Sequence, residues 1–170
     1  MEYNFRKASL HEADQIWLIL QHAIRRRKNE GSNQWQDGYP NPEIIRQDIQ
    51  KCIGHVLTHH DTIVGYSAVI FNDEPAYKNI EGQWLTNGEF IVVHRVAVAE
   101  SYLGRGLAKK MLEFIENIAL VNKVYSIKAD TNFDNIPMMK VFERLGYTYC
   151  GEVFFRGSAR KAYEKVLTGQ

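Results

Sequence analysis

The stretch that decides the fold runs from Phe90 to Asn117 and reads FIVVHRVAVAESYLGRGLAKKMLEFIEN. It opens with an apolar, β-branched run over Ile91–Val98, which is typical of a buried strand. A short turn then leads to two closely spaced glycines, Gly104 and Gly106. From there apolar side chains recur at helical spacing, at Leu107, Met111, Phe114, Ile115 and Ile118. The stretch therefore predicts a strand, a glycine-rich turn and a helix in direct succession.

The turn from Leu103 to Ala108 predicts a site for a phosphate or pyrophosphate group. A helix that begins here presents unpaired backbone N–H groups and the positive end of its dipole. Glycine has no β-carbon, so an anion can approach the backbone closely. The dinucleotide fingerprint is excluded because Lys109 stands at its third glycine, and no Gly-Lys-Ser/Thr follows to make a P-loop. An ordinary strand–helix turn is the alternative interpretation.

Length and composition favour a small soluble protein. The chain has 170 residues, and residues 1–170 are expected to form a single domain. The net charge of +1 argues against a nucleic-acid binder. No apolar run approaches the roughly 20 residues that span a bilayer, and the N-terminus does not read as a signal peptide. Cys52 and Cys150 lack the spacing of a metal or redox motif and are expected to be free thiols, and no metal site is predicted. A cytoplasmic location is expected.

The first third of the chain predicts a strand followed by two helices. Glu2–Ala8 alternates as a strand, and Ser9 stands three residues before Glu12 in a capping box that opens a helix. This helix is expected to run to the basic cluster at residues 25–28, which suits the negative end of its dipole. Residues 29–42 are rich in Gly, Asn, Asp and Pro and predict a loop, and a second helix is expected to start at Pro42. The loop aromatics Trp35 and Tyr39 either pack onto the core or line a ligand site.

The rest of the chain predicts a mixed α/β fold with one central sheet flanked by helices. Two runs around His59-His60-Asp61 form a hairpin, with residues 55–58 and 62–70 as its strands. Its two histidines are expected in a solvated turn rather than in a metal site. Residues 72–87 are expected to be irregular. Further strands are predicted over residues 124–129, 147–155 and 159–167, with a short helix after Asn135 that stops before Gly146.

The glycine turn resembles the pyrophosphate loop of the GCN5-related N-acetyltransferases (GNAT), whose pattern is Gln/Arg-x-x-Gly-x-Gly/Ala. Here the pattern reads Leu103-Gly104-Arg105-Gly106-Leu107-Ala108, in which Leu103 departs from the usual first residue. Asn135 and the pair Gly146-Tyr147 are similar to the asparagine before the family's short helix and to its closing Gly-Phe/Tyr pair. The order of predicted elements also resembles that of the family.

The resemblance implies a binding site for acetyl-CoA. The cosubstrate would lie where the central strand parts from its parallel neighbour. Backbone groups of Val96, Ala97 and Val98 would pair with its pantetheine arm. The amides of Leu103, Gly104, Arg105, Gly106, Leu107 and Ala108 would hold its pyrophosphate, and Asn135 would meet the pantetheine from the other side.

The resemblance also implies direct transfer of the acetyl group to a primary amine. The amine must lose a proton, and Glu89 and His94 are candidates for the base because both lie on or just before the central strand. In many members a tyrosine four residues before the closing glycine protonates the leaving thiolate. Phe142 occupies that position here, so Tyr147 is the candidate acid, with Tyr149, Tyr163 or water as alternatives. The backbone N–H of Val96 is a plausible donor to the carbonyl oxygen.

The predicted function is therefore an acetyl-CoA-dependent N-acetyltransferase, with a small-molecule amine favoured over a protein as acceptor. Trp35, Tyr39 and Trp84 are the candidate residues of an aromatic acceptor pocket. A catalytically silent CoA-binding or sensor domain is the first alternative, which Phe142 favours. An unrelated nucleotide-phosphate binder is the second. No nucleic-acid or membrane partner is expected, and a homodimer through the closing strands is possible.

Overall fold

The computed structural model describes residues 2–168 of the chain. Within these residues the strands are β1 (Tyr3–Lys7), β2 (Gly54–His59), β3 (Thr62–Phe71), β4 (Glu81–Gly82), β5 (Ile91–Val98), β6 (Ser126–Thr131), β7 (Thr148–Phe155) and β8 (Ser158–Val166). The α-helices are α1 (Ala13–Asn29), α2 (Pro42–Gln50), α3 (Leu107–Val121) and α4 (Ile136–Leu145). Three short 3-10 helices are η1 (Leu10–Glu12), η2 (Pro75–Asn79) and η3 (Glu100–Tyr102).

The chain divides into two compact units, each made of two segments. The first unit comprises Met1–Val69 and Arg95–Met111, and the second comprises Ile70–His94 and Leu112–Gln170. The division falls within β5. Strand order is β1-β2-β3-β5 in the first unit and β5-β6-β8-β7-β4 in the second, so the described strands belong to one mixed sheet of eight. This confirms the predicted α/β fold with a central mixed sheet.

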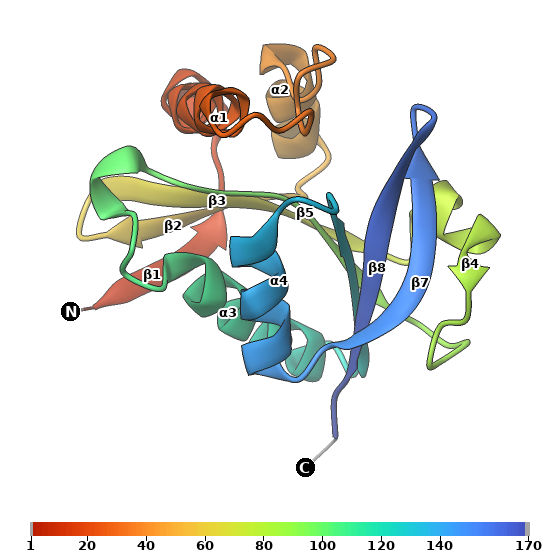
Figure 1. Cartoon of the computed structure of the whole chain (residues 1–170). Helices are drawn as coiled ribbons and strands as arrows, with labels where there is room; N and C mark the ends of the chain where they lie inside the picture. The colour runs from red at the N-terminus through yellow and green to blue at the C-terminus, as the bar shows by residue number, and fades with distance from the viewer. Residues whose placement is uncertain (1, 169–170) are drawn as a thin grey trace. The chain divides into compact units, whose positions relative to one another are not determined.

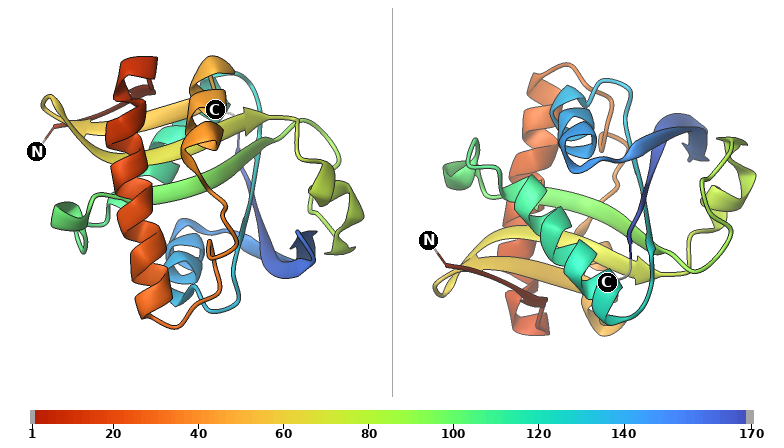
Figure 2. Two further views of the ribbon diagram at one scale, coloured as in Figure 1. Left: turned by 90° about the horizontal axis from the view of Figure 1, so that it is seen from above. Right: turned by 90° about the horizontal axis from the view of Figure 1, so that it is seen from below.

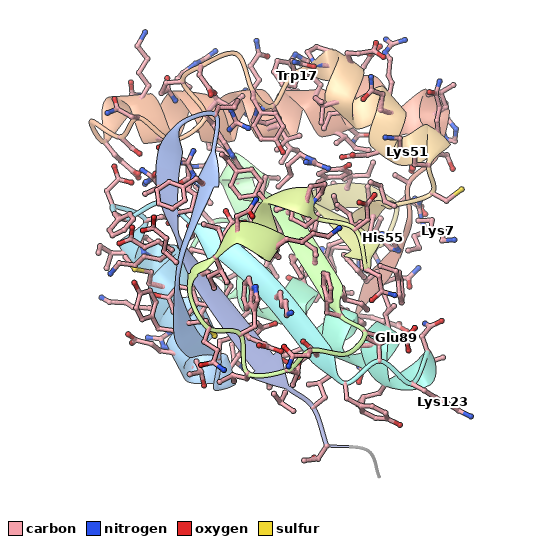
Figure 3. The ribbon with its side chains drawn as sticks, turned by 90° about the vertical axis from the view of Figure 1, so that its right-hand side faces the viewer. Lys7, Trp17, Lys51, His55, Glu89 and Lys123 are labelled. Carbon is pink, nitrogen blue, oxygen red and sulfur yellow. The ribbon has the colours of Figure 1, made fainter. Side chains whose placement is uncertain are left out.

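The first unit is an antiparallel meander covered by helices. The β1–β2 ladder runs from Tyr3 opposite His59 to Lys7 opposite His55, and β2 pairs with β3 through the predicted hairpin. Figure 1 shows α1 and α2 over one face of β2 and β3, and the left view of Figure 2 shows α1 crossing these strands. Figure 3 labels Trp17 of α1 and His55 of β2. Trp17 packs against the core of this unit, and buried His55 stacks on the ring of Phe5.

The second unit combines one parallel and several antiparallel pairings. β5 and β6 are parallel, from Ile91 opposite Ile127 to Val93 opposite Ala129, whereas β6–β8 and β7–β8 are antiparallel. Figure 1 shows α4 on one side of β7 and β8, with η2 and β4 on the other. The buried residues at the centre of the latter side are Tyr77, Val92, Val153 and Ala162.

The helix ends follow the chemistry of the sequence. The Ser9 N–H donates to the Glu12 carboxylate at 2.8 Å, which confirms the predicted capping box. Asn41 caps α2 by accepting from the Ile44 N–H at 3.0 Å, and Pro42 occupies the first turn. Gly146 ends α4 in the left-handed conformation, with φ of 80°.

One expectation about a strand is wrong, and the bounds of a second predicted strand are shifted. Residues 72–87 were expected to be irregular, yet they contain η2 and the two-residue β4, which pairs with β7. Gly82 faces Gly151 in this pairing, where a β-carbon on either would lie within 2.2 Å of a backbone oxygen. This pairing depends on two glycines that let the backbones approach closely, so no alternation of apolar and polar residues marks it in the sequence. The strand expected at residues 124–129 is β6, at 126–131, because the Val124 N–H still bonds the Ala119 carbonyl at 2.9 Å.

None of the helices in residues 2–168 combines the length and the apolar character that crossing a membrane requires.

Candidate active site

The predicted phosphate loop lies in the first unit, between η3 and α3. Gly104 and Gly106 have φ values of +74° and +72°, so both adopt the left-handed conformation that glycine allows. A β-carbon built on either would meet no atom of the described residues within 4 Å. The side of the loop that the glycines present is therefore open.

The start of α3 adds hydrogen-bond donors to this loop. α3 begins at Leu107, which confirms that a helix starts inside the glycine-rich segment. Its first internal bond runs from the Lys110 N–H to the Gly106 carbonyl at 3.1 Å, so the Leu107 and Ala108 N–H groups belong to the first turn and lack helical acceptors. Arg105 places its guanidinium 4.6 Å from the centre of the Tyr102 ring. Open space, left-handed glycines and first-turn N–H groups are together suited to binding an anion such as phosphate.

The segment Val96–Val98 lies in the same unit, directly after a break in the regular conformation of β5. Arg95 has φ of +56°, whereas strand residues have φ near −120°. Ala97 then packs into the core of the first unit, and the Ala99 N–H bonds the Val64 carbonyl of β3 at 2.8 Å. The Val98 carbonyl accepts a long, weak bond of 3.5 Å from Arg26.

A buried set of polar side chains surrounds Arg95, and we name Arg95, Asp48, Tyr66 and Tyr39 the Arg95 network. The guanidinium donates to both Asp48 oxygens, through Nε at 2.8 Å and Nη2 at 2.7 Å, and through Nη1 to the Tyr39 hydroxyl. The Tyr66 hydroxyl donates to Asp48 Oδ2 at 2.6 Å. Burial and the Asp48 charge raise the pKa of Tyr66, so this hydroxyl stays protonated.

A second polar set lies in the second unit, and we name His94, Glu74, Asp130 and Tyr77 the His94 network. His94 Nε2 lies 2.6 Å from Glu74 Oε2, and Nδ1 lies 3.7 Å from Asp130 Oδ1. The Tyr77 hydroxyl donates to the same Asp130 oxygen at 2.6 Å. The side chains of His94, Glu74 and Asp130 are 13%, 13% and 9% exposed. One imidazole is thus enclosed by two carboxylates in a place with little water.

Asp130 has a raised tendency to hold a proton. Burial raises the pKa of its carboxyl, while the neighbouring His94, the hydrogen bond from Tyr77 and the charge of Arg160 lower it in part. The net direction is upward. Its surroundings therefore favour the protonated form of the carboxyl.

The other two candidate catalytic residues differ from His94 in their surroundings. Glu89 is exposed at the end of the segment that leads into β5 (Figure 3). Tyr147 is buried beside Phe142, with ring centres 5.2 Å apart, and its hydroxyl has no hydrogen-bond partner among the described residues. Burial, with the charge of Glu116, raises the pKa of Tyr147. Its proton is therefore held tightly.

Asn135 has a structural role as the N-cap of α4. Its side-chain oxygen accepts from the Met138 N–H at 3.3 Å. This confirms the predicted cap. A contact of Asn135 with acetyl-CoA stays a prediction.

The three candidate acceptor aromatics each have a packing role. In the first unit, Trp35 packs against the core, and Tyr39 binds Arg95. In the second unit, Trp84 lies 5.0 Å from the Tyr77 ring and donates its Nε1–H to the Tyr77 carbonyl at 2.9 Å. Trp84 and His94 thus share Tyr77 as a neighbour, since the Tyr77 and His94 rings are 6.1 Å apart.

Sequence reasoning missed the acidic partners of both networks. Asp48 lies within the second helix, Glu74 precedes Pro75 in a segment expected to be irregular, and Asp130 directly follows the expected strand. Their separations from His94 and Arg95 range from 20 to 47 positions and match no motif. The position of Asp130 at a strand end was the one usable signal.

Sequence reasoning also missed Glu164, which has no exposed surface. Its carboxylate accepts from the Leu85 N–H at 2.6 Å, the Ser126 hydroxyl at 2.7 Å and the Thr86 hydroxyl. These bonds fasten the segment before β5 to β6 and β8. Lys128 lies beside it, with its ammonium 4.6 Å from the centre of the Trp84 ring.

In residues 2–168 no group of three or more His, Cys, Asp and Glu side chains is arranged to hold a metal ion. The two cysteines are free, with Cys52 exposed and Cys150 buried.

Known proteins resemble this chain over most of its length. The sequence matches the model of the acetyltransferase (GNAT) family over residues 17–147, which is more than half of the chain. An uncharacterized N-acetyltransferase of Bacillus subtilis (strain 168), YesJ, is 25% identical over 167 residues, which cover 96% of this chain and 89% of YesJ. The spermine/spermidine N(1)-acetyltransferase of the same organism is 34% identical over 74 residues, 43% of this chain and 45% of that protein.

A solved structure agrees with these relatives. The GNAT-family acetyltransferase from Streptococcus agalactiae 2603 superposes with a TM-score of 0.89 at 35% identity, over 98% of this chain and 96% of that one. The chain therefore belongs to the acetyltransferase (GNAT) family and is an N-acetyltransferase that uses acetyl-CoA as its cosubstrate.

Proposed function

We propose that this enzyme transfers the acetyl group to a primary amine of a small molecule, and that His94 accepts the proton that the amine loses. The observation that carries the proposal is the enclosure of His94 between Glu74 and Asp130. Imidazole is the side chain best suited to accept and release a proton at neutral pH. His94 is preferred to Glu89 because Glu89 is exposed, whereas two carboxyl groups orient the His94 ring.

The chemistry needs one proton acceptor and one leaving group. The amine nitrogen attacks the thioester carbonyl carbon, a C–N bond forms, the C–S bond breaks, and the thiolate leaves with the electron pair. When His94 Nε2–H donates to Glu74, Nδ1 is the nitrogen that takes up the proton from the amine. The Glu74 carboxylate, 2.6 Å from Nε2, then stabilises the imidazolium that forms.

Backbone groups of two segments and one side chain are proposed to hold acetyl-CoA. The amides of Leu103–Ala108 bind its pyrophosphate, and the backbone of Val96–Val98 binds its pantetheine arm. The Val96 N–H is the proposed donor to the carbonyl oxygen. Asn135 is the proposed side-chain contact.

The leaving thiolate needs no protein acid in this proposal. A thiol has an ordinary pKa of about 8.5, so its anion is a good leaving group. The thiolate takes a proton from water, and His94 returns the amine's proton to the hydroxide that is left. Burial raises the pKa of Tyr147, which makes this hydroxyl a poor donor, and Phe142 has no hydroxyl. The absence of a tyrosine at position 142 is thus compatible with catalysis.

Two observations support a small-molecule amine as acceptor. One relative is a spermine/spermidine N(1)-acetyltransferase by name, although the match covers less than half of that protein. The His94 network also carries two carboxylates, and the aromatic rings of Tyr77 and Phe155 lie 6.1 and 5.8 Å from His94. Carboxylates and aromatic rings both favour a cationic amine.

The test is release of CoA from acetyl-CoA in the presence of small amines, polyamines and a peptide with a free N-terminus. We expect turnover with small amines, and a loss of about 10²-fold or more in kcat for His94→Gln. Glu89→Gln is the matched control and should retain turnover. Activity with the peptide alone would overturn the small-molecule acceptor, and an active His94→Gln variant would overturn the role of His94.

The phosphate loop is tested by thermal unfolding with and without acetyl-CoA. A ligand that binds only the folded protein raises Tm, and Gly106→Trp should abolish that rise by filling the open side of the loop. Gly157→Trp is the matched control, because Gly157 has φ of +74° and equally open surroundings in the β7–β8 turn. An undiminished rise in Gly106→Trp would show that the loop does not hold the cosubstrate.

A further inference from the structure

The unusual backbone of Arg95 requires a cause. A residue with a β-carbon is unfavourable at positive φ, yet Arg95 has φ of +56° within β5. Such a conformation persists where the surrounding structure determines it, and it is frequent at functional sites. The residues around Arg95 therefore show what holds this part of β5.

The Arg95 side chain is fixed at every donor group of its guanidinium. Its Nε and Nη2 donate to the Asp48 carboxylate of α2, and its Nη1 donates to the Tyr39 hydroxyl in the loop before α2. The side chains of Arg95 and Asp48 are 8% and 5% exposed, so water competes little for these bonds. Two-pronged binding of this kind fixes direction as well as distance.

Asp48 is itself held in place by β3 and β2. The Tyr66 hydroxyl donates to Asp48 at 2.6 Å, and Tyr66 has no exposed surface. Gly54 leaves room for this hydroxyl, since a β-carbon there would lie 2.9 Å from it. Strands β2 and β3 thus support Asp48, Asp48 supports Arg95, and Arg95 is the residue directly before Val96.

The backbone of Val96–Val98 is consequently fixed at both ends. Arg95 sets its direction at the start, and the bond of the Ala99 N–H to the Val64 carbonyl, 2.8 Å, sets it at the end. Ala97 is buried between these two points. Loss of the restraint at Arg95 would release the start of this segment.

We propose that Asp48, supported by Tyr66 and Tyr39, is a positioning residue for acetyl-CoA binding: it holds Arg95 in the left-handed conformation and so presents the backbone of Val96–Val98 to the pantetheine arm. The inference rests on the proposed role of Val96–Val98. It assigns a part in cosubstrate binding to a helix side chain that touches neither the cosubstrate nor the reacting atoms.

The experiment uses Asp48→Asn, its combination with Arg95→Gly, and Asp14→Asn as a control for loss of a helix carboxylate at an exposed site. In Asp48→Asn we expect KM for acetyl-CoA to rise about tenfold, with kcat at saturation within about threefold of wild type because His94 keeps its own partners. The double variant removes the unpaired guanidinium, and glycine adopts positive φ without help. It should therefore recover most of the KM change and should also fold where the single variant is unstable.

The outcomes separate this inference from the proposed function. A wild-type enzyme whose Tm does not respond to acetyl-CoA would overturn both. Normal wild-type binding with an unchanged KM in Asp48→Asn, whatever its Tm, would overturn the inference alone. A double variant with a KM as high as that of the folded single variant would also overturn it, since backbone conformation would not be the cause.

Discussion

His94 and Arg95 are neighbours in sequence, yet their side chains belong to networks of different character. The Arg95 network matches charge with charge, because one guanidinium faces one carboxylate and every donor group has an acceptor. The His94 network places two carboxylates around one imidazole. The first arrangement holds a shape, since the guanidinium binds both oxygens of one carboxylate. The second holds an imidazole, which is the side chain suited to proton transfer.

The largest expected effect is on stability, in the Arg95 network. Arg95→Met leaves the buried Asp48 carboxylate without its cation, and breaking a buried pair in this way costs about 3–5 kcal/mol. Urea unfolding measures this change. Arg46→Met is the matched control, because the Arg46–Asp14 pair on the surface is worth about 0–1 kcal/mol. Equal losses of unfolding free energy in the two variants would mean that burial of the Arg95 network does not add to stability.

The next effect is on rate, in the His94 network. Glu74→Gln keeps a side chain that can cap η2 but removes the charge beside His94 Nε2, so kcat should fall about 10²-fold while Tm changes little. Steady-state kinetics and a melting curve measure the two quantities. Glu81→Gln, an exposed change in β4, serves as control. A large fall in Tm with an unchanged kcat would assign a structural role to Glu74. Both networks would then stabilise the fold, and neither would act in catalysis.

A smaller effect distinguishes the tyrosine donors of the two networks. Tyr66→Phe removes a bond to Asp48, whose charge Arg95 fixes, and should cost about 1.5–3 kcal/mol. Tyr77→Phe removes a bond to Asp130, which can take up a proton instead, and should cost about 0.5–1.5 kcal/mol. Urea unfolding of both variants at neutral pH gives the comparison. A larger loss in the free energy of unfolding for Tyr77→Phe than for Tyr66→Phe would contradict the view that protonation of Asp130 replaces the lost hydrogen bond.

Each of the two networks was only partly accessible to prediction. Periodicity and capping residues are local signals, and they identified α1, the hairpin, β5 and the glycine loop before the start of α3. His94 and Tyr39 were singled out from their positions on the central strand and in an aromatic loop. Asp48 and Glu74 were not, because their roles arise from contacts with residues 47 and 20 positions away. The pairing of β4 with β7 depends on two facing glycines, which carry no periodic signal.

The smallest effect is on the pH dependence of stability. One carboxyl group in each unit should contribute to it, and the two contributions should change in opposite directions as pH rises. In the first unit the hydrogen bond from Arg6 lowers the pKa of Glu12, so Glu12 contributes stability above its unfolded pKa of about 4.3, and this is lost as pH falls through the lower folded value. In the second unit burial raises the pKa of Asp130, so its contribution is complete below the unfolded pKa of about 3.9 and is lost as pH rises through the higher folded value. Glu12→Gln should therefore flatten the acid limb of stability against pH, and Asp130→Asn should flatten the decline on its alkaline side. Urea unfolding from pH 3 to pH 8 measures both slopes, and an Asp130→Asn variant that declines as steeply as wild type would show that this carboxyl does not retain its proton in the folded enzyme.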